Sequence, residues 1–316
     1  MPLLRDNPDD FLALVTATAE DISYPPGWVE KDYWITEILR SLSEPFDDFL
    51  VVFKGGTSLS KAWRLIQRMS QDVDILLVPR ENVGSNRRDK GLKSITARAS
   101  NAVQMEPSPI TSSTGIHRAT NLKYSPAFQD QVVPPEVLLE IGVRGGPDPN
   151  ERMQIRSFIA EYALTRAGAA EDEFDEFRSV EIRCLGPERT LVEKLSALHQ
   201  LATKNAEGEG LKIGTSARHY YDIAMLLGNA DVLNRIQNGA VGRIATDVDA
   251  RSAAAGWAFA ERPPSGYGES PAFSDAFLAR DEVNDAYSAA LELVIGGPRP
   301  ALADVADKVR SLAGLL

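Results

Sequence analysis

The sequence predicts an α+β protein whose first half mixes helices with strands and whose second half is mostly helical. Three observations support this fold class. Continuous apolar runs of strand length stand at 49–53 and 136–143, each bounded by turn-forming residues. Apolar residues at helical spacing follow Gly55-Gly56. From Pro187 onward, helical spacing is the dominant pattern.

The elements expected in the first half follow from apolar spacing and from the breakers between segments. Residues 80–130 are the least regular stretch, for which we expect a loop, a helix and at least one strand. The pattern predicts helices over 8–21, 28–42, 58–69 and 90–104, and strands over 49–53, 73–78 and 136–143.

The second half carries clear helix signals. Pro187 suits the first position of a helix, because the N–H that proline lacks would be unpaired there. Ser216 is a candidate cap for the next helix. Three glycines mark the loop between these helices: Gly208, Gly210 and Gly214. We expect two closing helices, about 280–295 and 301–315.

Length and composition indicate a globular protein of two domains, 1–150 and 151–316, the second mainly helical. Hydrophobic residues make up 43% of the chain, which is enough for a sizeable core. Cys184 is the single cysteine, so a disulfide within the chain is excluded and a reducing compartment is expected. Without a signal peptide or an apolar span of membrane length, we expect a cytoplasmic protein that avoids membranes.

The charge is strongly negative but uneven. The formal net charge of −11 argues against a protein that coats nucleic acid, although it leaves room for a local basic groove. Residues 80–98 contain six Lys or Arg and two Asp or Glu, whereas residues 171–176 form an acidic run. The simpler interpretation of both runs is solvated surface.

The stretch from Lys54 to Ser58 has the composition of a phosphate-binding turn. Two glycines between a strand and a helix let the backbone approach an anion closely. A helix N-terminus offers unpaired N–H groups and a favourable dipole to phosphate. Thr57 and Ser58 add hydroxyl donors at the same place. No Gly-x-x-x-x-Gly-Lys-Ser/Thr loop is present, so a P-loop enzyme is not predicted.

A pair of carboxylates opens the next strand. Asp72 and Asp74 are two residues apart, and the period of a strand sends both side chains to one face, roughly 6–7 Å apart. Such a pair can hold one or two Mg²⁺ ions that clamp a transferring phosphoryl group. Taken alone, an Asp-x-Asp pair is more often a strand end or a cap. The combination with the glycine turn favours the catalytic interpretation.

Three further polar residues are candidates for the same site. Glu140 interrupts an apolar run, where a charge is costly unless it is paired or binds metal, so it is the candidate third ligand. Lys194 could neutralise charge on a triphosphate, and Asp222 could orient that lysine or activate an acceptor hydroxyl. The alternatives are an exposed strand residue for Glu140 and ordinary helix-surface salt bridges for Lys194 and Asp222.

The remaining metal-type side chains do not suggest a site. The three histidines share no metal-like spacing, and Cys184 has no histidine nearby in the sequence. We therefore expect Cys184 in the core and the histidines packed or facing solvent: His117, His199 and His219.

These residues resemble a known family, the AbiEii/MenT toxins, which are nucleotidyltransferase-like members of bacterial toxin–antitoxin systems. The resemblance begins with Lys54-Gly55-Gly56-Thr57-Ser58-Leu59 followed by Arg68 to Asp74. It covers most of the chain. Its other parts, in the family's order, are Glu30-Lys31-Asp32, Leu139-Glu140-Ile141, Pro187 to Lys194, Arg218 with Tyr221-Asp222-Ile223, and the stretch from Arg280 to Leu312.

The resemblance implies a polymerase-β-type nucleotidyltransferase core and a specific activity. Members transfer a nucleoside monophosphate from an NTP to an acceptor, reported for some as the 3′ end of tRNA. The family's catalytic residues correspond to Ser70, Asp72, Lys194 and Asp222. Asp74 would complete a site for Mg²⁺, with Mn²⁺ as the alternative ion. The stretch Lys54 to Ser58, together with Arg68, would bind the nucleotide.

The resemblance also implies partners and control. A cognate antitoxin from a neighbouring gene is expected, and some members are restrained by phosphorylation of the serine that corresponds to Ser70. Two other functions remain open at this point. One is transfer of the nucleotide to a protein or a small molecule. The other is a non-catalytic nucleotide-binding module, against which the presence of both Asp72 and Asp74 counts.

Overall fold

The computed structural model describes residues 1–316 except 47, 81–82, 129–132, 207–212 and 257–258. Two compact units emerge from the packing. The first comprises 1–62, 71–144 and 150–184, and the second comprises 63–70, 145–149 and 185–316. The division into domains near residue 150 stays a prediction. The packing nevertheless places the strands formed by residues 150–155 and 180–184 with the first unit.

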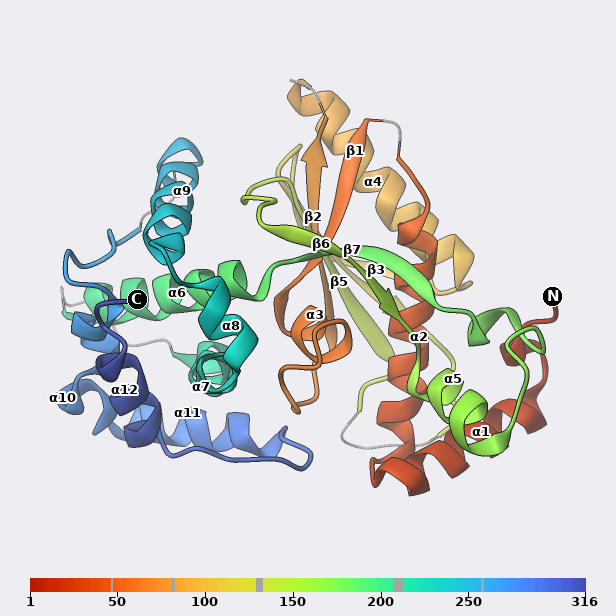
Figure 1. Ribbon diagram of the computed structural model, residues 1–316. Helices are drawn as coiled ribbons and strands as arrows, with labels where there is room; N and C mark the ends of the chain where they lie inside the picture. Colours follow the sequence, from red (N-terminus) through yellow and green to blue (C-terminus); the bar gives the residue numbers. More distant parts are fainter. Residues whose placement is uncertain (47, 81–82, 129–132, 207–212, 257–258) are drawn as a thin grey trace. The chain divides into compact units, whose positions relative to one another are not determined.

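The first unit is built on one mixed sheet, drawn in Figure 1. In the described part of the chain its strand order is β3-β4-β5-β2-β1-β7-β6. Strand β2 pairs antiparallel with β1 and parallel with β5. The strands are β1 Phe49–Lys54, β2 Asp72–Pro79, β3 Glu106–Ser113, β4 His117–Lys123, β5 Glu136–Gly142, β6 Asn150–Ile155 and β7 Val180–Leu185.

Helices cover this sheet. In Figure 1, α2 and α4 lie side by side, and both pack against sheet strands. The helical segments of the first unit are η1 Leu4–Asp6, α1 Pro8–Ile22, α2 Pro26–Ser43, α3 Gly55–Lys61, α4 Ser85–Ala102, α5 Phe158–Tyr162, η2 Ala163–Ala167 and η3 Asp175–Phe177. A separate apolar core joins α1, α2 and α5, with Phe11, Tyr33 and Ile159 among its members.

The second unit is helical in its described residues. Helix α7 packs against α6, α8, α11 and α12. The elements are α6 Pro187–Ala206, η4 Gly214–Ala217, α7 Arg218–Gly228, α8 Ala230–Arg235, α9 Ala240–Ala254, η5 Tyr267–Glu269, η6 Pro271–Phe273, α10 Asp275–Leu278, α11 Asp281–Glu292 and α12 Leu302–Ser311. Residues 67–69 pair with 293–295 through backbone hydrogen bonds, so a segment from early in the sequence belongs to this unit.

The predicted α+β class is confirmed, and most element predictions agree with the structure to within a few residues. The helix predicted over 58–69 is wrong in its extent. Helix α3 begins at Gly55 and ends at Lys61, and Arg64 then adopts a positive φ of 55°. The apolar spacing continues to Ile66 because these residues pack in the second unit. There the Trp63 indole donates to the Leu185 carbonyl.

The structure tests the predicted cap at Ser216 and the predicted loop glycines before it. Ser216 does not cap a helix. It lies inside the short 3₁₀ segment η4, which leads directly into α7 without a side-chain cap at Ala217. Of the three predicted loop glycines, Gly214 opens η4, whereas Gly208 and Gly210 lie outside the described residues. Pro187 is the first residue of α6, as predicted.

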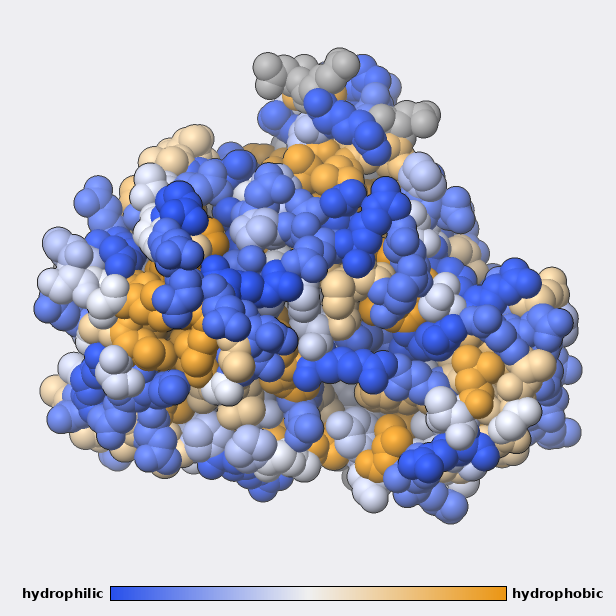
Figure 2. All heavy atoms as spheres, in the orientation of Figure 1, coloured by the Kyte–Doolittle hydropathy of each residue, from blue (hydrophilic) through white to orange (hydrophobic). Residues whose placement is uncertain are grey.

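A helix that spans a membrane must be both long and apolar. Across the helices that the structure describes, none combines the length and the apolar character needed to cross a bilayer. Figure 2 shows mainly hydrophilic residues on the visible face, with hydrophobic residues gathered in separate patches. Cys184 is buried, as expected for a core cysteine.

Candidate active site

The turn after β1 brings Gly55 into contact with a catalytic candidate. Gly55 has a φ of +77°, a conformation that residues with a side chain rarely adopt. A Cβ atom at this position would overlap the carboxylate of Asp74. The first glycine of the pair is therefore required twice, once for the backbone angle and once for the close approach of Asp74.

The predicted carboxylates lie on one face of the sheet. Asp74 is in register with Lys54 on β1 and with Glu140 on β5, so these three residues form a row across neighbouring strands. Asp72 lies two residues before Asp74 and shares its face. The opposite face of β2 and β5 is apolar and fully buried at Val73, Ile75, Val137, Leu139 and Ile141.

The electrostatics of this row favour a bound cation. Burial raises the pKa of Glu140, and the charges of Asp74 and Asp72 raise it further. A side-chain hydrogen bond between Asp74 and Glu140 raises the pKa of Glu140 in the same direction. Like-charged carboxylates this close cannot both ionise easily unless a positive ion neutralises them.

The carboxylates of this row suit a divalent ion. Among the described residues, no group of three His, Cys, Asp or Glu side chains is arranged to enclose a metal. The donor set is instead a neighbouring pair of carboxylates, Asp74 and Glu140, with Asp72 beside them. Mg²⁺ is commonly held by one or two carboxylates, with water and substrate phosphates as its other ligands. The chemistry of the residues therefore fits Mg²⁺.

The two hydroxyls predicted as phosphate donors are used inside the protein. Thr57 donates its hydroxyl to the Asp72 carbonyl, and Ser58 donates to the Gly55 carbonyl at 3.0 Å. Both side chains are buried, and a buried hydroxyl needs a partner. Their roles are to join α3 to the start of β2 and to close the turn.

Lys31 is a site residue that the sequence did not single out for chemistry. Its side chain is 1% exposed, and its Nζ donates at 3.3 Å both to Gln71 Oε1 and to the Pro134 carbonyl. Burial lowers the pKa of Lys31 to about 8, although the charges of Asp72 and Glu136 oppose the shift. The available signal in the sequence was a lysine inside an aromatic-rich helical pattern. Such a pattern indicates a buried helix face, and buried lysines are rare.

Replacing Lys31 with methionine should remove an alkaline rise in stability. Because the folded state releases this proton near pH 8 and the unfolded chain near 10.5, the unfolded state binds more protons between those values, and stability increases with pH. Relative to Lys31→Met, the wild type should gain about 2 kcal/mol from pH 8 to pH 10 in urea unfolding. Replacing the exposed Lys308 with methionine should leave the pH dependence unchanged. Parallel curves for wild type and Lys31→Met would show that Lys31 titrates normally.

A second cluster lies within the second unit, centred on Asp222. The Arg68 guanidinium donates two hydrogen bonds to this carboxylate, from Nε to Oδ1 at 2.7 Å and from Nη2 to Oδ2 at 2.8 Å. Lys194 Nζ lies 2.8 Å from Oδ2. Asp222 is fully buried and both cationic side chains are at most 8% exposed. A bidentate pair of this kind is geometrically specific.

The charges in this cluster shape one another. Burial alone would raise the pKa of Asp222, but Arg68 and Lys194 outweigh it and hold that pKa well below its usual range. Burial and Arg68 lower the pKa of Lys194 against the attraction of Asp222. Burial and the charge of Lys194 lower the pKa of His219, whose Nδ1 lies 3.3 Å from Nζ. A neutral imidazole accepting from Lys194 is the arrangement that results.

This geometry bears on two predicted roles. An aspartate with a strongly lowered pKa and two cationic partners is a poor general base, so the contact supports the role in which Asp222 orients Lys194. Arg68, predicted to bind the nucleotide, is buried with its Nε and Nη2 on Asp222 and its Nη1 on the Met69 carbonyl. It holds Asp222 in place.

The structure thus groups the predicted residues in two sets, each within its own unit. The sheet unit holds Lys54, Gly55, Asp72, Asp74 and Glu140, and the helical unit holds Arg68, Lys194 and Asp222. Ser70 is half-buried and is the last residue of the 63–70 segment, two positions before Asp72 in the sequence.

Comparisons with known proteins show a family and a similar fold. The family model described as "Nucleotidyl transferase AbiEii toxin, Type IV TA system" matches residues 37–309. Among solved structures, the chain is similar to MenT4, a nucleotidyltransferase toxin from Mycobacterium tuberculosis H37Rv. The TM-score is 0.53 and the identity 17%, over 96% of this chain and 88% of that one. At this identity the likeness is one of fold. No curated protein sequence matches the chain.

Proposed function

Because the chain belongs to the AbiEii family of nucleotidyltransferase toxins of type IV toxin–antitoxin systems, we propose that it moves a nucleoside monophosphate from an NTP to RNA. The proposed acceptor is the 3′ end of tRNA. The observation that carries the proposal is the row of Lys54, Asp74 and Glu140, with Asp72 beside it and Gly55 closing against Asp74.

In this proposal the sheet unit binds the reacting phosphates. Asp72 and Asp74, with Glu140, would hold Mg²⁺, which when bound supplies positive charge to the triphosphate and aligns it. The Gly55-Gly56 turn leaves room for the backbone to approach the phosphates. Lys54, beside Asp74 in the register, adds a fixed positive charge on the neighbouring strand.

The transfer itself is a substitution at the α-phosphorus. The acceptor hydroxyl oxygen forms the new P–O bond, the bond to the β-phosphate oxygen breaks, and pyrophosphate leaves while the hydroxyl proton passes to solvent. Lys194, oriented by Asp222, is proposed to stabilise negative charge that develops on the phosphates. Arg68 and Asp222 are positioning residues because they act through Lys194.

Membership of this toxin–antitoxin family also implies an antitoxin as a partner. Control by phosphorylation of Ser70 stays a prediction. Ser70 is only half-buried, and it stands two residues before Asp72 in the sequence. A phosphate on Ser70 would therefore add negative charge close in sequence to the carboxylates. An RNA acceptor also supports the expected cytoplasmic location.

The decisive experiment incubates the pure protein with total bacterial RNA, Mg²⁺ and each α-labelled NTP in turn, followed by a denaturing gel. We expect a labelled band of tRNA size with one or two of the NTPs. Asp72→Ala should remove the label, and Asp285→Asn, which changes an exposed carboxylate on α11, should retain it. Label in protein, or in no macromolecule, would replace RNA with a protein or small-molecule acceptor.

A further inference from the structure

A groove runs along helix α4, on the side of that helix that meets the start of β1. Its volume is 570 Å³. The helix and the strand pack closely here. A Cβ atom at Gly91 would lie only 2.6 Å from the ring of Phe49. We name it the α4 groove and define it by Phe46, Asp48, Phe49, Arg87, Lys90 and Arg98.

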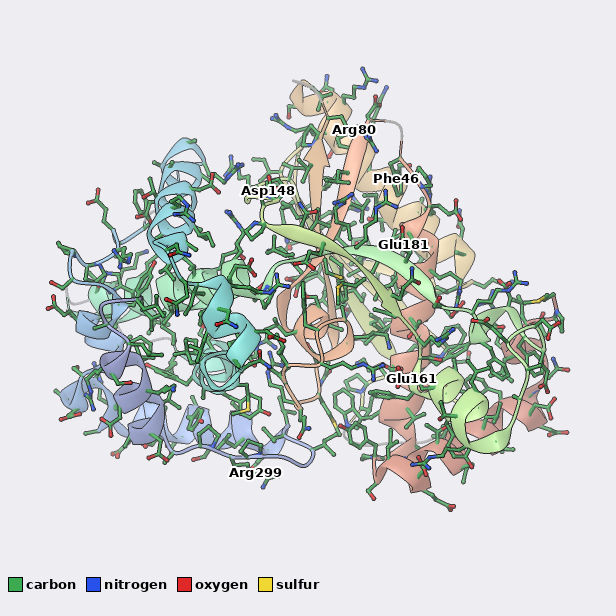
Figure 3. All side chains as sticks on the ribbon, in the orientation of Figure 1. Phe46, Arg80, Asp148, Glu161, Glu181 and Arg299 are labelled. Atoms are coloured by element: carbon green, nitrogen blue, oxygen red, sulfur yellow. The ribbon has the colours of Figure 1, made fainter. Side chains whose placement is uncertain are left out.

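The charge of the α4 groove is opposite to that of the protein. Among the described residues that line it, three side chains are cationic and one, Asp48, carries a carboxylate, in a chain whose net charge is −11. A smaller neighbouring cavity of 170 Å³ shares Phe46 and Phe49. It adds three arginines and two glutamates, among them Arg80 and Glu181, which Figure 3 labels close to Phe46. Together the described residues of the two cavities include six cationic and three acidic side chains.

Arg98 is half-buried and is held in the groove by an aromatic ring and two backbone carbonyls. The centre of its guanidinium lies 3.6 Å from the centroid of the Phe46 ring. Its Nη1 donates to the carbonyls of Glu44 and Pro45 at 3.0 and 3.3 Å. A guanidinium fixed in this way loses little conformational freedom when it binds an anion.

The outer side of the groove offers exposed cations. Arg87 and Lys90 are both exposed and stand three residues apart, on one face of α4. Arg87 pairs with Asp48, and this surface pair is 39% or more exposed at both side chains, so it is easily exchanged for another anion. Lys90 forms no ion pair with a described residue.

We propose that the α4 groove binds the phosphodiester backbone of the RNA acceptor, which rests on the proposed function above. Phosphate contacts need cations and hydrogen-bond donors, and the groove supplies Arg87, Lys90, Arg98, Asn86 and Ser94. An acidic protein partner would favour exposed aromatic anchors, whereas Phe46 and Phe49 are 8% and 5% exposed.

The position of the groove sets a length requirement on the acceptor. Phe49 is the first residue of β1 and Lys54 the last, so the groove and the carboxylate row lie at opposite ends of this strand, roughly 17 Å apart. They also lie on opposite faces of the sheet, since α4 packs on the apolar face. An acceptor of a few nucleotides cannot reach both places, but an RNA of tRNA size can.

The test compares a tRNA-sized acceptor with a four-nucleotide acceptor in the variant Arg87→Gln/Lys90→Gln. For the long acceptor we expect KM to rise roughly tenfold at 0.1 M salt, and the slope of log affinity against log salt to fall by about two. KM for the NTP and for the short acceptor should not change. Lys308→Gln, which neutralises an exposed lysine on α12, is the matched control and should behave as wild type.

Each outcome decides the proposal. An unchanged KM and salt slope for the long acceptor would overturn it, as would an equal loss for both acceptors. A variant that binds RNA normally but loses affinity for its antitoxin would assign the groove to a protein partner and also overturn it. If the wild type labels no RNA, the proposed function fails. The salt dependence of direct RNA binding, measured without NTP, then still decides whether the groove binds a phosphodiester chain.

Discussion

Asparagine in place of Asp74 should reduce nucleotidyl transfer by roughly a thousandfold while leaving the protein folded. Asparagine has nearly the volume of aspartate and retains a hydrogen bond to Glu140, so the contact with Gly55 survives. What is lost is the negative charge beside Glu140 and Asp72. Transfer rates at saturating NTP and Mg²⁺ measure the effect.

Stability separates this result from misfolding. Removing one of several neighbouring carboxylate charges relieves repulsion, so the thermal midpoint of Asp74→Asn should equal or exceed that of the wild type. Asp285→Asn is the control for a neutralised exposed carboxylate. Glu140→Gln tests the third ligand and should lose activity to a similar degree, because its carboxylate must ionise to hold a cation. Near-normal transfer by Asp74→Asn would exclude the carboxylate row as the reaction site.

Asparagine in place of Asp222 should cost about 3–5 kcal/mol of stability, the largest structural effect we expect. The change leaves Arg68 and Lys194 buried without their shared counter-charge. Because the pKa of Asp222 lies well below its usual range, the stabilisation is present at neutral pH and is lost as pH falls through the acid range. Urea unfolding of both proteins at several pH values measures the difference.

A double variant shows whether the loss comes from unpaired charge. Asp222→Asn combined with Lys194→Met removes one of the two buried cations together with the carboxylate, and should recover part of the lost stability. Equal stability of the single and double variants would contradict this account. Transfer should remain low in both, since each disturbs or removes Lys194, the group proposed to stabilise phosphate charge.

Much of the fold could be predicted from local pattern. Strand β1 and strand β5 are apolar runs between breakers, and α6 begins at the proline that the sequence marks as a helix start. Such signals depend on residues close in the sequence, and they survive folding when the tertiary contacts agree with them. Where the contacts disagree, the prediction is wrong. Residues 62–69 continue the helical apolar spacing, but Arg64 has a positive φ and residues 67–69 pair with 293–295, so the helix ends at Lys61.

The sequence by itself determined the local arrangement at 54–58 and 72–74, since a strand, a glycine turn and two carboxylates at a spacing of two place their backbone and side chains without help from distant residues. Only the tertiary structure decided that Glu140 stands next to Asp74, that Lys31 lies buried near Asp72, and that Arg68 grips Asp222 across 154 positions. The physical reason is that an unpaired charge is costly in the low-dielectric interior of a protein. Each buried charge is therefore paired with a residue that folding brings close to it. Such a partner can be distant in the sequence, so sequence spacing does not predict the pair.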